Sequence, residues 1–344
     1  MKRTIKFWFT LATILVVLGA LITVLPACSS GGIKDMVYKN FETKTHDVVD
    51  EFSGVYIDSK TAQITFVKSE DNKAKVVCFE KDKTSFSVAV EDGALKIKLI
   101  DNRKWFEKIF DWGTDKITVS LPQEVYGALT IKNDTGDITI PKGFTFATID
   151  IQASTGDVEC SASSIGSVKI KTSTGNITVA VEDNEKILSS GLYLFVSTGR
   201  VEVSNVDCAG EFKVTVSTGK TKINNVTCGS FDSEGNTGDI SITNFTCAQT
   251  FEIERSTGDV TMANCIAGKI EIETDTGDVK FNECDANEIE IETDTGDVKG
   301  TLLSGKNFFV ESDTGRKIYP KDSTGGRCSI STDTGRIEIS IVNR

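Results

Sequence analysis

The sequence is almost devoid of histidine, the residue that most often moves protons in enzymes. His46 is the only histidine among 344 residues, and it lies outside the repeated part of the chain described below. This nearly excludes a histidine-based catalytic triad or metal site. The sequence also lacks a Gly-x-Ser-x-Gly motif, a phosphate-binding loop and a dinucleotide-binding fingerprint. We therefore predict that the protein is not an enzyme and carries no cofactor.

Paired cysteines and clusters of positive charge are missing as well. No Cys-x-x-Cys pair occurs among the nine cysteines, which argues against a zinc site. Lys and Arg together number 38 against 50 for Asp and Glu, which gives a net charge of −12. Nucleic-acid phosphates require clustered Lys and Arg. The composition therefore predicts no nucleic-acid partner.

Charged residues are absent from one long segment near the N-terminus, residues 7–25. As a helix, its 19 residues would just span a bilayer core of about 30 Å. Lys2, Arg3 and Lys6 precede it, and basic flanks stay in the cytoplasm. We predict a cytoplasmic flank over residues 1–6, a transmembrane helix over 7–25 and a linker over 26–45. The rest would be the extracytoplasmic body of a single-pass cell-membrane protein.

Two other interpretations of this region stay open. A signal peptide that is cleaved normally has a shorter apolar region, of about 7 to 15 residues. The stretch "LPACSS" places Cys28 after a small residue and before a small-residue linker, as in bacterial lipoproteins, where such a cysteine is lipidated. Pro26 fits that signal poorly. All three interpretations export the body, and an uncleaved helix or a lipid would tether it to the membrane.

What the sequence does contain is a repeat. Thr-Gly steps recur at intervals of 19 or 20 residues, apart from one interval of 24 that holds the insertion "AVEDNEKILSSGL". Chance does not produce this spacing. The eleven glycines that follow this period are Gly136, Gly156, Gly175, Gly199, Gly219, Gly238, Gly258, Gly277, Gly296, Gly315 and Gly335.

Apolar residues alternate with polar ones on both sides of each Thr-Gly step. Around Gly277 the apolar residues are Ile270, Ile272, Val279 and Phe281. Period-two alternation indicates short strands with one buried face, and no stretch has the period of a crossover helix. Units of this length stack as coils, because one unit cannot bury its own inner face. We predict an all-β fold, a right-handed parallel β-helix (β-solenoid) of about eleven coils over residues 129–344. Residues 46–128 would form irregular first coils and a cap.

The doubled acids around the glycine can be explained in two ways. Gly takes tight corners, and a Ser or Asp two residues before it, found in ten units, bonds nearby amides. The alternative is a calcium site, since Ca²⁺ takes six to eight oxygen ligands. Its ligands would be Asp275, Asp278, Asp294 and Asp297. Not every corner is acidic, because four units replace the Asp after Gly with a base: Arg200, Lys220, Arg316 and Arg336. We expect Lys220 and Arg316 to end the run of four stacked Asp between them.

Five cysteines follow the repeat period, with spacings of 20, 19, 18 and 19 residues. Residues at one phase of a solenoid stack about 4.8 Å apart, whereas a disulfide needs Cβ atoms about 3.8 Å apart. Cysteine also packs as a small hydrophobic residue. We therefore favour a buried core column over a metal site or disulfides. The five are Cys208, Cys228, Cys247, Cys265 and Cys284.

The stretch "RKWFEKIFDWG" is the least regular part of the N-terminal region. It could close the open end of the core, which an exposed sheet edge requires. Alternatively, it forms a docking patch for a membrane or a partner, with Lys104 and Lys108 nearby. The residues of the patch would be Trp105, Phe106, Ile109, Phe110 and Trp112.

These features together resemble a bacterial family labelled as putative adhesins with β-strand repeats, common in Gram-positive anaerobes. The resemblance rests on the Ser/Asp-Thr-Gly-Asp-Val units, the N-terminal anchor, "RKWFEKIFDWG" and "KITVSLPQEVYGALTIKNDTGDI", and it covers residues 36–344. It implies a β-solenoid ectodomain on a membrane-anchored protein, without catalytic residues.

The function expected from these features is a rigid, acidic rod that acts as an adhesin-like scaffold for a surface protein or glycan. One alternative is an envelope sensor or structural subunit of a membrane complex, partnered through the aromatic patch. The other is an enzyme acting on polysaccharides, which would need long loops around a cleft. Only one insertion occurs among the ten repeat intervals.

Overall fold

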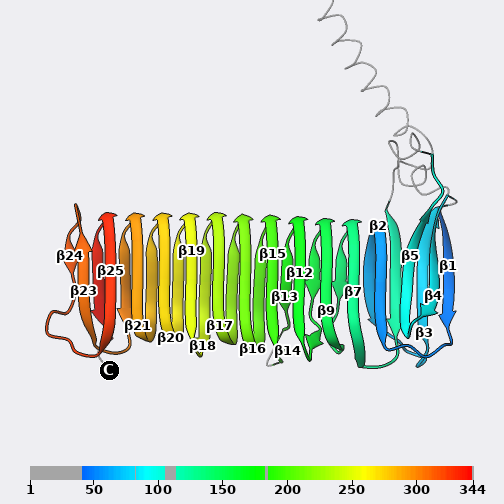
Figure 1. Ribbon diagram of the computed structural model, residues 1–344, viewed down its shortest axis with the longest axis horizontal. Coiled ribbons are helices and arrows are strands. Elements are labelled where there is room, and N and C mark those ends of the chain that lie inside the picture. The colour runs from blue at the N-terminus through cyan, green and yellow to red at the C-terminus, as the bar shows by residue number, and fades with distance from the viewer. Residues whose placement is uncertain (1–40, 82, 105–113, 183–184, 343–344) are drawn as a thin grey trace, which may run out of the picture.

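The computed structural model describes residues 41–342, except for residues 82, 105–113 and 183–184. Every regular element in this part of the chain is a β-strand, and the strands stack into one long rod (Figure 1). The predicted β-solenoid is confirmed, with about eleven turns. Among the described residues, no helix is long and apolar enough to cross a membrane. The helix predicted for residues 7–25 lies outside the described residues and stays a prediction.

The repeats form the long middle part of the rod, where successive coils pair in parallel; the register shifts between Cys208 and Glu211 in β16. Each strand neighbours the strand one repeat away, so equivalent side chains form columns along the rod axis. In chain order the strands are β7 (Val125–Thr135), β8 (Ile138–Ile140), β9 (Thr145–Thr155), β10 (Val158–Cys160), β11 (Ser163–Ser164), β12 (Ser167–Thr174), β13 (Ile177–Ala180), β14 (Ile187–Ser189), β15 (Gly191–Thr198), β16 (Val201–Thr218), β17 (Thr221–Thr237), β18 (Ile240–Cys247), β19 (Thr250–Thr257), β20 (Val260–Thr276), β21 (Val279–Thr295) and β22 (Val298–Leu302).

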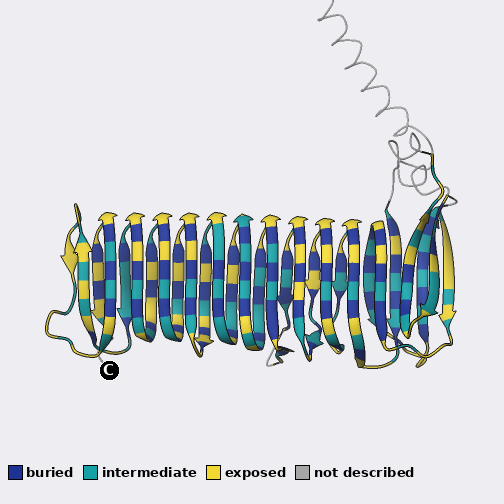
Figure 2. Ribbon diagram, viewed as in Figure 1, coloured by how far each residue is buried: buried dark blue, intermediate teal, exposed yellow. Residues whose placement is uncertain are grey.

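Each coil bends at fixed points and buries alternate residues, as β20 illustrates. The strand turns at Asn264, whose φ is 54°, and the coil turns again at the Thr276–Gly277 step. Between these corners, buried and exposed positions alternate along the strand (Figure 2). The side chains that this coil contributes to the core are Val260, Met262, Cys265, Ala267, Ile270 and Ile272.

At the N-terminal end, the first coil of the chain is not the first coil of the stack. Strand β2 pairs in parallel with β5 and β6 on one side and with β7 and β8 on the other. The coil of β2 therefore lies between two coils that follow each other in the sequence. Beyond it, β1, β3 and β4 pair antiparallel and cover the end of the stack. The strands are β1 (Phe41–Val48), β2 (Gly54–Lys68), β3 (Ala74–Lys81), β4 (Thr84–Glu91), β5 (Ala94–Asp101) and β6 (Asp115–Leu121).

The C-terminal end repeats this arrangement. Strands β23 (Lys306–Ser312) and β24 (Lys317–Ile318) form the outermost coil, although β25 (Gly326–Thr334) and β26 (Ile337–Ile341) follow them in the chain. Strand β25 pairs with β21 on one side and with β23 on the other, and β26 pairs with β22 and β24. The last coil of the chain is thus inserted between two coils that precede it, which the repeat spacing did not predict.

The five repeat-phase cysteines are buried in the core, between 1 and 3% exposed, so their interpretation as core residues is confirmed. The single column expected for them is wrong. Cys208, Cys228 and Cys247 pair in register, but Cys265 pairs with Phe245. Equivalent positions of these two coils are 20 residues apart, so the interval of 18 places Cys265 two residues before the position equivalent to Cys247, in the neighbouring inward column.

Candidate functional site

The Thr-Gly corner of each coil stacks directly on the corner of the coil below. At Gly258 the φ angle is 141°, and an added Cβ would lie 2.3 Å from the carbonyl oxygen of Gly238. An L-residue is strained at this φ, and that distance is far below van der Waals contact. Both the local turn and the close stacking therefore require glycine at this column.

The Asp after each glycine holds the next coil. Asp259 Oδ1 accepts a hydrogen bond from the backbone N–H of Asp278 at 2.9 Å, and Asp278 Oδ1 accepts one from Asp297 at 2.9 Å. Earlier in the stack, Asp137 Oδ1 accepts from the N–H of Asp157 at 2.9 Å. These bonds hold the pKa of Asp278 below its usual range, chiefly through the N–H of Asp297 and then through Lys280. The repeated carboxylate is therefore a backbone acceptor in a ladder that runs along the rod axis.

Basic residues stand where this ladder ends, because a Lys or Arg side chain cannot accept a hydrogen bond. Asn176 Oδ1 accepts from the N–H of Arg200 at 3.0 Å, and the first ladder stops there. The second begins at Asp239, whose carboxylate pairs with Lys220 at 2.9 Å, as expected.

The expectation that Arg316 caps the other end of this second ladder is wrong. Arg336 lies next to Asp297 instead, and donates to it through its backbone N–H at 2.8 Å and through Nη2 at 3.0 Å. The cause is the inserted C-terminal coil, which places Arg336 between Asp297 and Arg316. These donors and Lys299 hold the pKa of Asp297 well below its usual range, with the N–H of Arg336 as the largest cause.

The four residues predicted to bind calcium fall in two columns. Asp278 and Asp297 belong to the ladder, and each also contacts a lysine at 2.9 Å, Lys280 and Lys299 respectively. Asp275 and Asp294 are exposed, two residues before the glycine, on the outer side of the corner. Within the described part of the chain, no group of three or more His, Cys, Asp or Glu side chains is arranged to hold a metal ion. Calcium binding at these residues stays a prediction.

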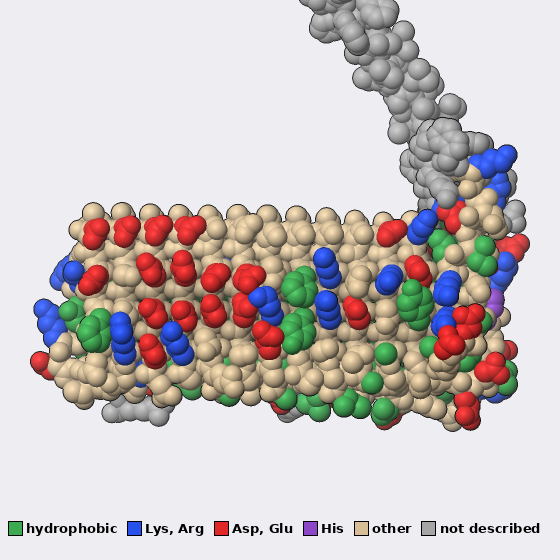
Figure 3. Space-filling view, viewed as in Figure 1, with side chains coloured by type: hydrophobic (Ala, Val, Ile, Leu, Met, Phe, Trp, Pro, Cys, Tyr) green, Lys and Arg blue, Asp and Glu red, His purple; other side chains and the backbone are tan. Residues whose placement is uncertain are grey.

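A second set of carboxylates forms an acidic face on the flank of the rod, visible as rows of red side chains in Figure 3. These residues point outward from β17, β19, β20 and β21, in strands whose alternate residues fill the core. The register places Glu252 beside Glu271 and Glu254 beside Glu273. The columns of the acidic face are Asp232, Glu252, Glu271 and Glu290, and next to them Glu234, Glu254, Glu273 and Glu292.

The acidic face carries repulsion that only a few cations offset. Lys213 contacts Asp232 at 2.6 Å and Glu234 at 2.7 Å, at the end of the two columns. Burial, followed by the charges of Glu271 and other neighbouring acids, raises the pKa of Glu252. Adjacent like charges at about 5 Å repel by about 1 kcal/mol in water-like surroundings. The face therefore stores unfavourable electrostatic free energy that a cation or a drop in pH would release.

One cation lies beneath the acidic face. The side chain of Arg255 is 3% exposed, and its Nη2 donates to Ser233 Oγ at 2.7 Å. It fits there because its neighbour in the adjacent coil is Gly235, where an added Cβ would lie 1.7 Å from Arg255 Nη1. Burial lowers the pKa of this guanidinium to about 10. Arg255 therefore remains charged at neutral pH and opposes the repulsion between the columns above it.

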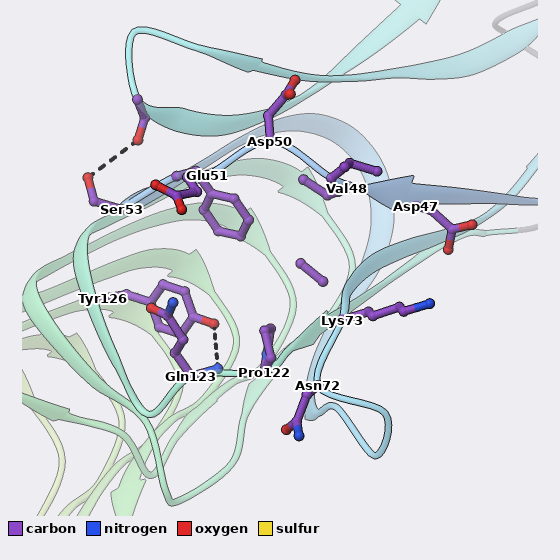
Figure 4. A pocket seen from close by; sticks show the side chains of 14 residues that line it. Asp47, Val48, Asp50, Glu51, Ser53, Asn72, Lys73, Pro122, Gln123 and Tyr126 are labelled. Carbon is purple, nitrogen blue, oxygen red and sulfur yellow. Dashed lines mark hydrogen bonds between the residues drawn. The ribbon is translucent and has the colours of Figure 1, made fainter.

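A hollow lies at the covered N-terminal end, where strand β2 begins (Figure 4). It encloses about 970 Å³ and is open to solvent. Tyr126 lines it, stacks on Phe52 at 6.0 Å, and accepts a hydrogen bond from the N–H of Gln123 at 2.9 Å. Asp47, Asp50 and Glu51 are also among the residues that line it. The lining contains no histidine and no cysteine, so it offers no nucleophile paired with an imidazole base.

Two of the predicted sites lie outside the described residues. They are the aromatic patch, from Trp105 to Trp112, and Cys28, predicted to be a lipidation site. The structure therefore leaves both predictions as they stand.

The sequence prediction missed two sets of stacked residues, the glutamates of the acidic face and the asparagines of the second corner, although both follow the repeat period. The glutamates of the acidic face recur at the repeat period on the outward phase of the strands. The asparagines do the same at the second corner of each coil, where Asn225 Nδ2 donates to Asn205 Oδ1 at 2.6 Å and Asn264 Nδ2 donates to Asn244 Oδ1 at 3.0 Å. All four take φ values of 53 to 59°, which asparagine tolerates better than most residues. The repeat period applied to every position, rather than to Gly and Cys alone, identifies both the glutamate columns and the stacked asparagines.

Several solved structures are similar to this chain over 88% of its length. One is a putative adhesin from Bacteroides fragilis NCTC 9343, with 14% identity, 98% of that chain covered and a TM-score of 0.42. Another is a putative lipid binding protein from Parabacteroides distasonis ATCC 8503, with 14% identity, 97% covered and a TM-score of 0.34. A third is a putative cell adhesion protein from Clostridium sporogenes ATCC 15579, with 9% identity, 100% covered and a TM-score of 0.21.

No curated protein matches the sequence. A family model does match, over residues 52–210, 162–314 and 230–344, which together include nearly the whole described body. The chain therefore belongs to the Toastrack DUF4097 family.

Proposed function

We propose that the protein is a membrane-anchored, extracytoplasmic scaffold whose β-solenoid carries a non-catalytic, adhesin-like interaction surface. The observation that supports this most strongly is the unbroken register from β17 to β21. Because the columns continue residue for residue, the flank is flat and rigid. A polysaccharide-acting enzyme would need a cleft built by long loops, whereas the polar side chains of this flank lie side by side.

The anchor follows from the sequence, in which residues 7–25 carry no charge and three basic residues precede them. Eleven coils at about 4.8 Å give a rod of roughly 50 Å. Such a rod would hold its far end away from the membrane, where it can reach a surface protein or glycan. The net charge of the body would also keep it from lying on anionic lipid.

Anchoring and export can be tested in cells that express the full chain. We expect the protein to stay with the membrane fraction after an alkaline wash and to be digested by protease added to intact cells. A variant that lacks residues 7–25 should leave the membrane fraction. A full chain that is washed off, or that is protected in intact cells but digested after lysis, would contradict the proposal.

The interaction role is tested by binding of these cells to glycan arrays and to one another. Cells with the full chain should bind above cells with empty vector, and replacement of Glu271 and Glu273 by Lys should change the set of bound glycans. The aromatic patch distinguishes the sensor alternative. If changes at Trp105 and Trp112 abolish an envelope response while surface binding is unchanged, the protein is a sensor subunit rather than an adhesin.

A further inference from the structure

The outermost coil at the C-terminal end is an uncovered end of the stack. Among the described residues, β23 pairs only with β25 and β24 only with β26. At the opposite end, the antiparallel strands β1, β3 and β4 cover the stack. A strand with one neighbour presents a free row of backbone N–H and C=O groups, which can pair with another strand. The two ends of the rod are therefore different, and only the C-terminal end offers a free parallel coil.

This end also exposes apolar side chains. Phe309 of β23 is 56% exposed and Ile318 of β24 is 40% exposed. Phe308 and Val310 face the core but are only half-buried: the ring of Tyr319 packs against that of Phe308 at 5.9 Å, and no further coil covers the two residues. In the coils below, the equivalent inward residues are fully buried, for example Ile289 and Ile291 at 1% exposure. The core is thus unfinished on this side.

The sequence of β23 fits an antiparallel partner of the same sequence. If two copies of "KNFFVES" pair about Phe309, the two Phe309 side chains lie opposite each other on the outer face. Phe308 then lies opposite Val310 on the inner face, and Asn307 lies opposite Glu311. No like charges face each other, and aromatic and aliphatic cross-strand pairs stabilise such an edge. A two-fold axis through Phe309 would give the self-complementary contact of a symmetric dimer.

The distribution of charge favours contact at this end over contact along the flank. Residues 229–302 contain 17 acidic and four basic residues, whereas residues 303–341 contain five acidic and six basic ones. Two rods side by side would bring their acidic bands together. Two rods end to end keep the bands apart by the two outer coils of each copy, about 20 Å in all. Repulsion between exposed charges is largely screened beyond about 8 Å at physiological salt.

We propose that the end coil of β23 and β24 is a docking surface for a second copy of this chain, joined by antiparallel pairing of β23 about Phe309. The pairing would merge the two unfinished cores into one continuous stack. This inference rests on the proposed function for its biological meaning: with an anchor at the N-terminal end of each rod, the pair would bridge two membranes roughly 100 Å apart. The end coil would then bind a second copy of this chain, in addition to whatever the flank of the rod binds.

The first test measures association of the full chain in detergent micelles by sedimentation equilibrium. Phe309→Lys places two positive charges opposite each other at the two-fold axis, so we expect the dimer to weaken at least about tenfold in Kd. Ile165→Lys is the matched control, since Ile165 is an exposed apolar residue (68%) between β11 and β12, away from the end coil. It should dimerise like the unchanged chain. Equal circular dichroism melting of both variants shows that the fold is intact. A monomeric unchanged chain, or a Phe309→Lys variant that still dimerises, overturns the proposal.

The second test fixes the geometry by a cross-link. The eight described cysteines are buried, so the substitutions are made in a Cys28→Ser chain. Phe309→Cys places one thiol of each copy at the two-fold axis. Under copper-phenanthroline, O₂ takes two electrons and two protons from the thiol pair, which becomes a disulfide. We expect a covalent dimer from Phe309→Cys and none from Ile165→Cys. Equal yields, or no dimer from either, contradict antiparallel pairing at β23.

Vesicles separate this proposal from the proposed function. Two populations that carry the reconstituted full chain should cluster in light scattering, and Phe309→Lys should prevent clustering. If the chain dimerises in micelles through Phe309 but the vesicles stay apart, docking holds and bridging between membranes fails. If the chain is monomeric but cells still bind glycans, the adhesin-like function holds and the second copy is not its partner.

Discussion

Lys306 and Asp285 form an ion pair at 2.5 Å across the inserted C-terminal coil. In the register, Lys306 lies beside Gly326, so its side chain passes this small residue to reach a carboxylate of β21 two coils away. The lysine side chain is only 4% exposed, and Ser304 Oγ accepts its second hydrogen bond at 2.7 Å. This contact joins the outermost coil to the stack beneath the coil that separates them.

Removal of one partner of this pair should destabilise the C-terminal end of the rod. We expect Lys306→Met to lower the free energy of unfolding by about 2–4 kcal/mol, because a half-buried carboxylate loses its cation. Asp285→Asn should cost a similar amount, and the double variant should cost less than the sum of the two. Urea denaturation of the three variants provides the cycle. Additive costs would mean that the two side chains do not interact.

The glycine corner should tolerate no side chain where coils stack. Gly258→Ala adds a methyl 2.3 Å from the carbonyl of Gly238, whereas Gly143→Ala adds one at φ 92° with nothing within 4 Å. The second variant carries only the cost of positive φ, about 1 kcal/mol. The first adds a steric clash, so we expect a loss of about 3 kcal/mol or more. Thermal melting compares them, and equal losses would show that stacking does not select glycine here.

The carboxylate ladder should depend on an acceptor oxygen rather than on negative charge. Asp278→Asn retains an oxygen that can accept from the N–H of Asp297, whereas Asp278→Ala leaves that N–H without its acceptor. We expect the alanine variant to lose about 1–2 kcal/mol more than the asparagine variant. Hydrogen exchange at the amide of Asp297 should be faster only in the alanine variant. Equal behaviour of the two variants would contradict the ladder.

Stability should rise and then fall as the pH is lowered from 7. The pKa of Glu252 is raised, so the stability it contributes is complete only below its unfolded-state pKa of about 4.3 and is lost as pH rises through the folded value. The pKa values of Asp278 and Asp297 are lowered, so their contribution is present above about pH 4 and lost as pH falls through the folded values.

The melting temperature should therefore increase from pH 7 to about pH 5 and decrease below about pH 4. High salt at pH 7 should reproduce part of the increase, because it screens the acidic face. Glu252→Gln should show a smaller increase than the unchanged chain. A melting temperature that falls steadily from pH 7 downward would mean that repulsion on the face is negligible.

Calcium provides the test of the predicted metal site. If Asp275, Asp278, Asp294 and Asp297 bind Ca²⁺, the ion should raise the melting temperature of the full chain, and a chelator should reverse this. Replacement of Asp275 and Asp294 by Asn should abolish the shift while leaving the ladder carboxylates in place. Melting that is unaffected by millimolar calcium would leave these residues as corner acceptors and surface charges.

The regular part of the fold could be predicted because the local sequence of each unit determines its strands and its corner. The alternation of Ile270 and Ile272 and the corner at Gly277 specify one coil, and stacking follows from the need to bury its inner face. The order of coils at the C-terminal end could not be predicted in this way. The units around Gly315 and Gly335 are alike locally, and only long-range contacts such as that of Lys306 decide which one lies next to β21. The error over Arg316 and Arg336 has this cause.

At each end of the rod one coil is inserted between two others, and this arrangement affects how the rod folds and unfolds. In an ordinary solenoid the chain ends are the outermost coils, so fraying and trimming by proteases begin there. Here the coil of β2 and the coil of β25 and β26 each have a neighbour on both sides. We therefore expect each of them to unfold only after the coil outside it has unpaired. The position of β25 lies between β21 and β23, so it is complete only once β23 has taken its place on the far side. We therefore expect the coil of β25 and β26 to fold after the coil of β23 and β24, since it occupies the space between that coil and β21.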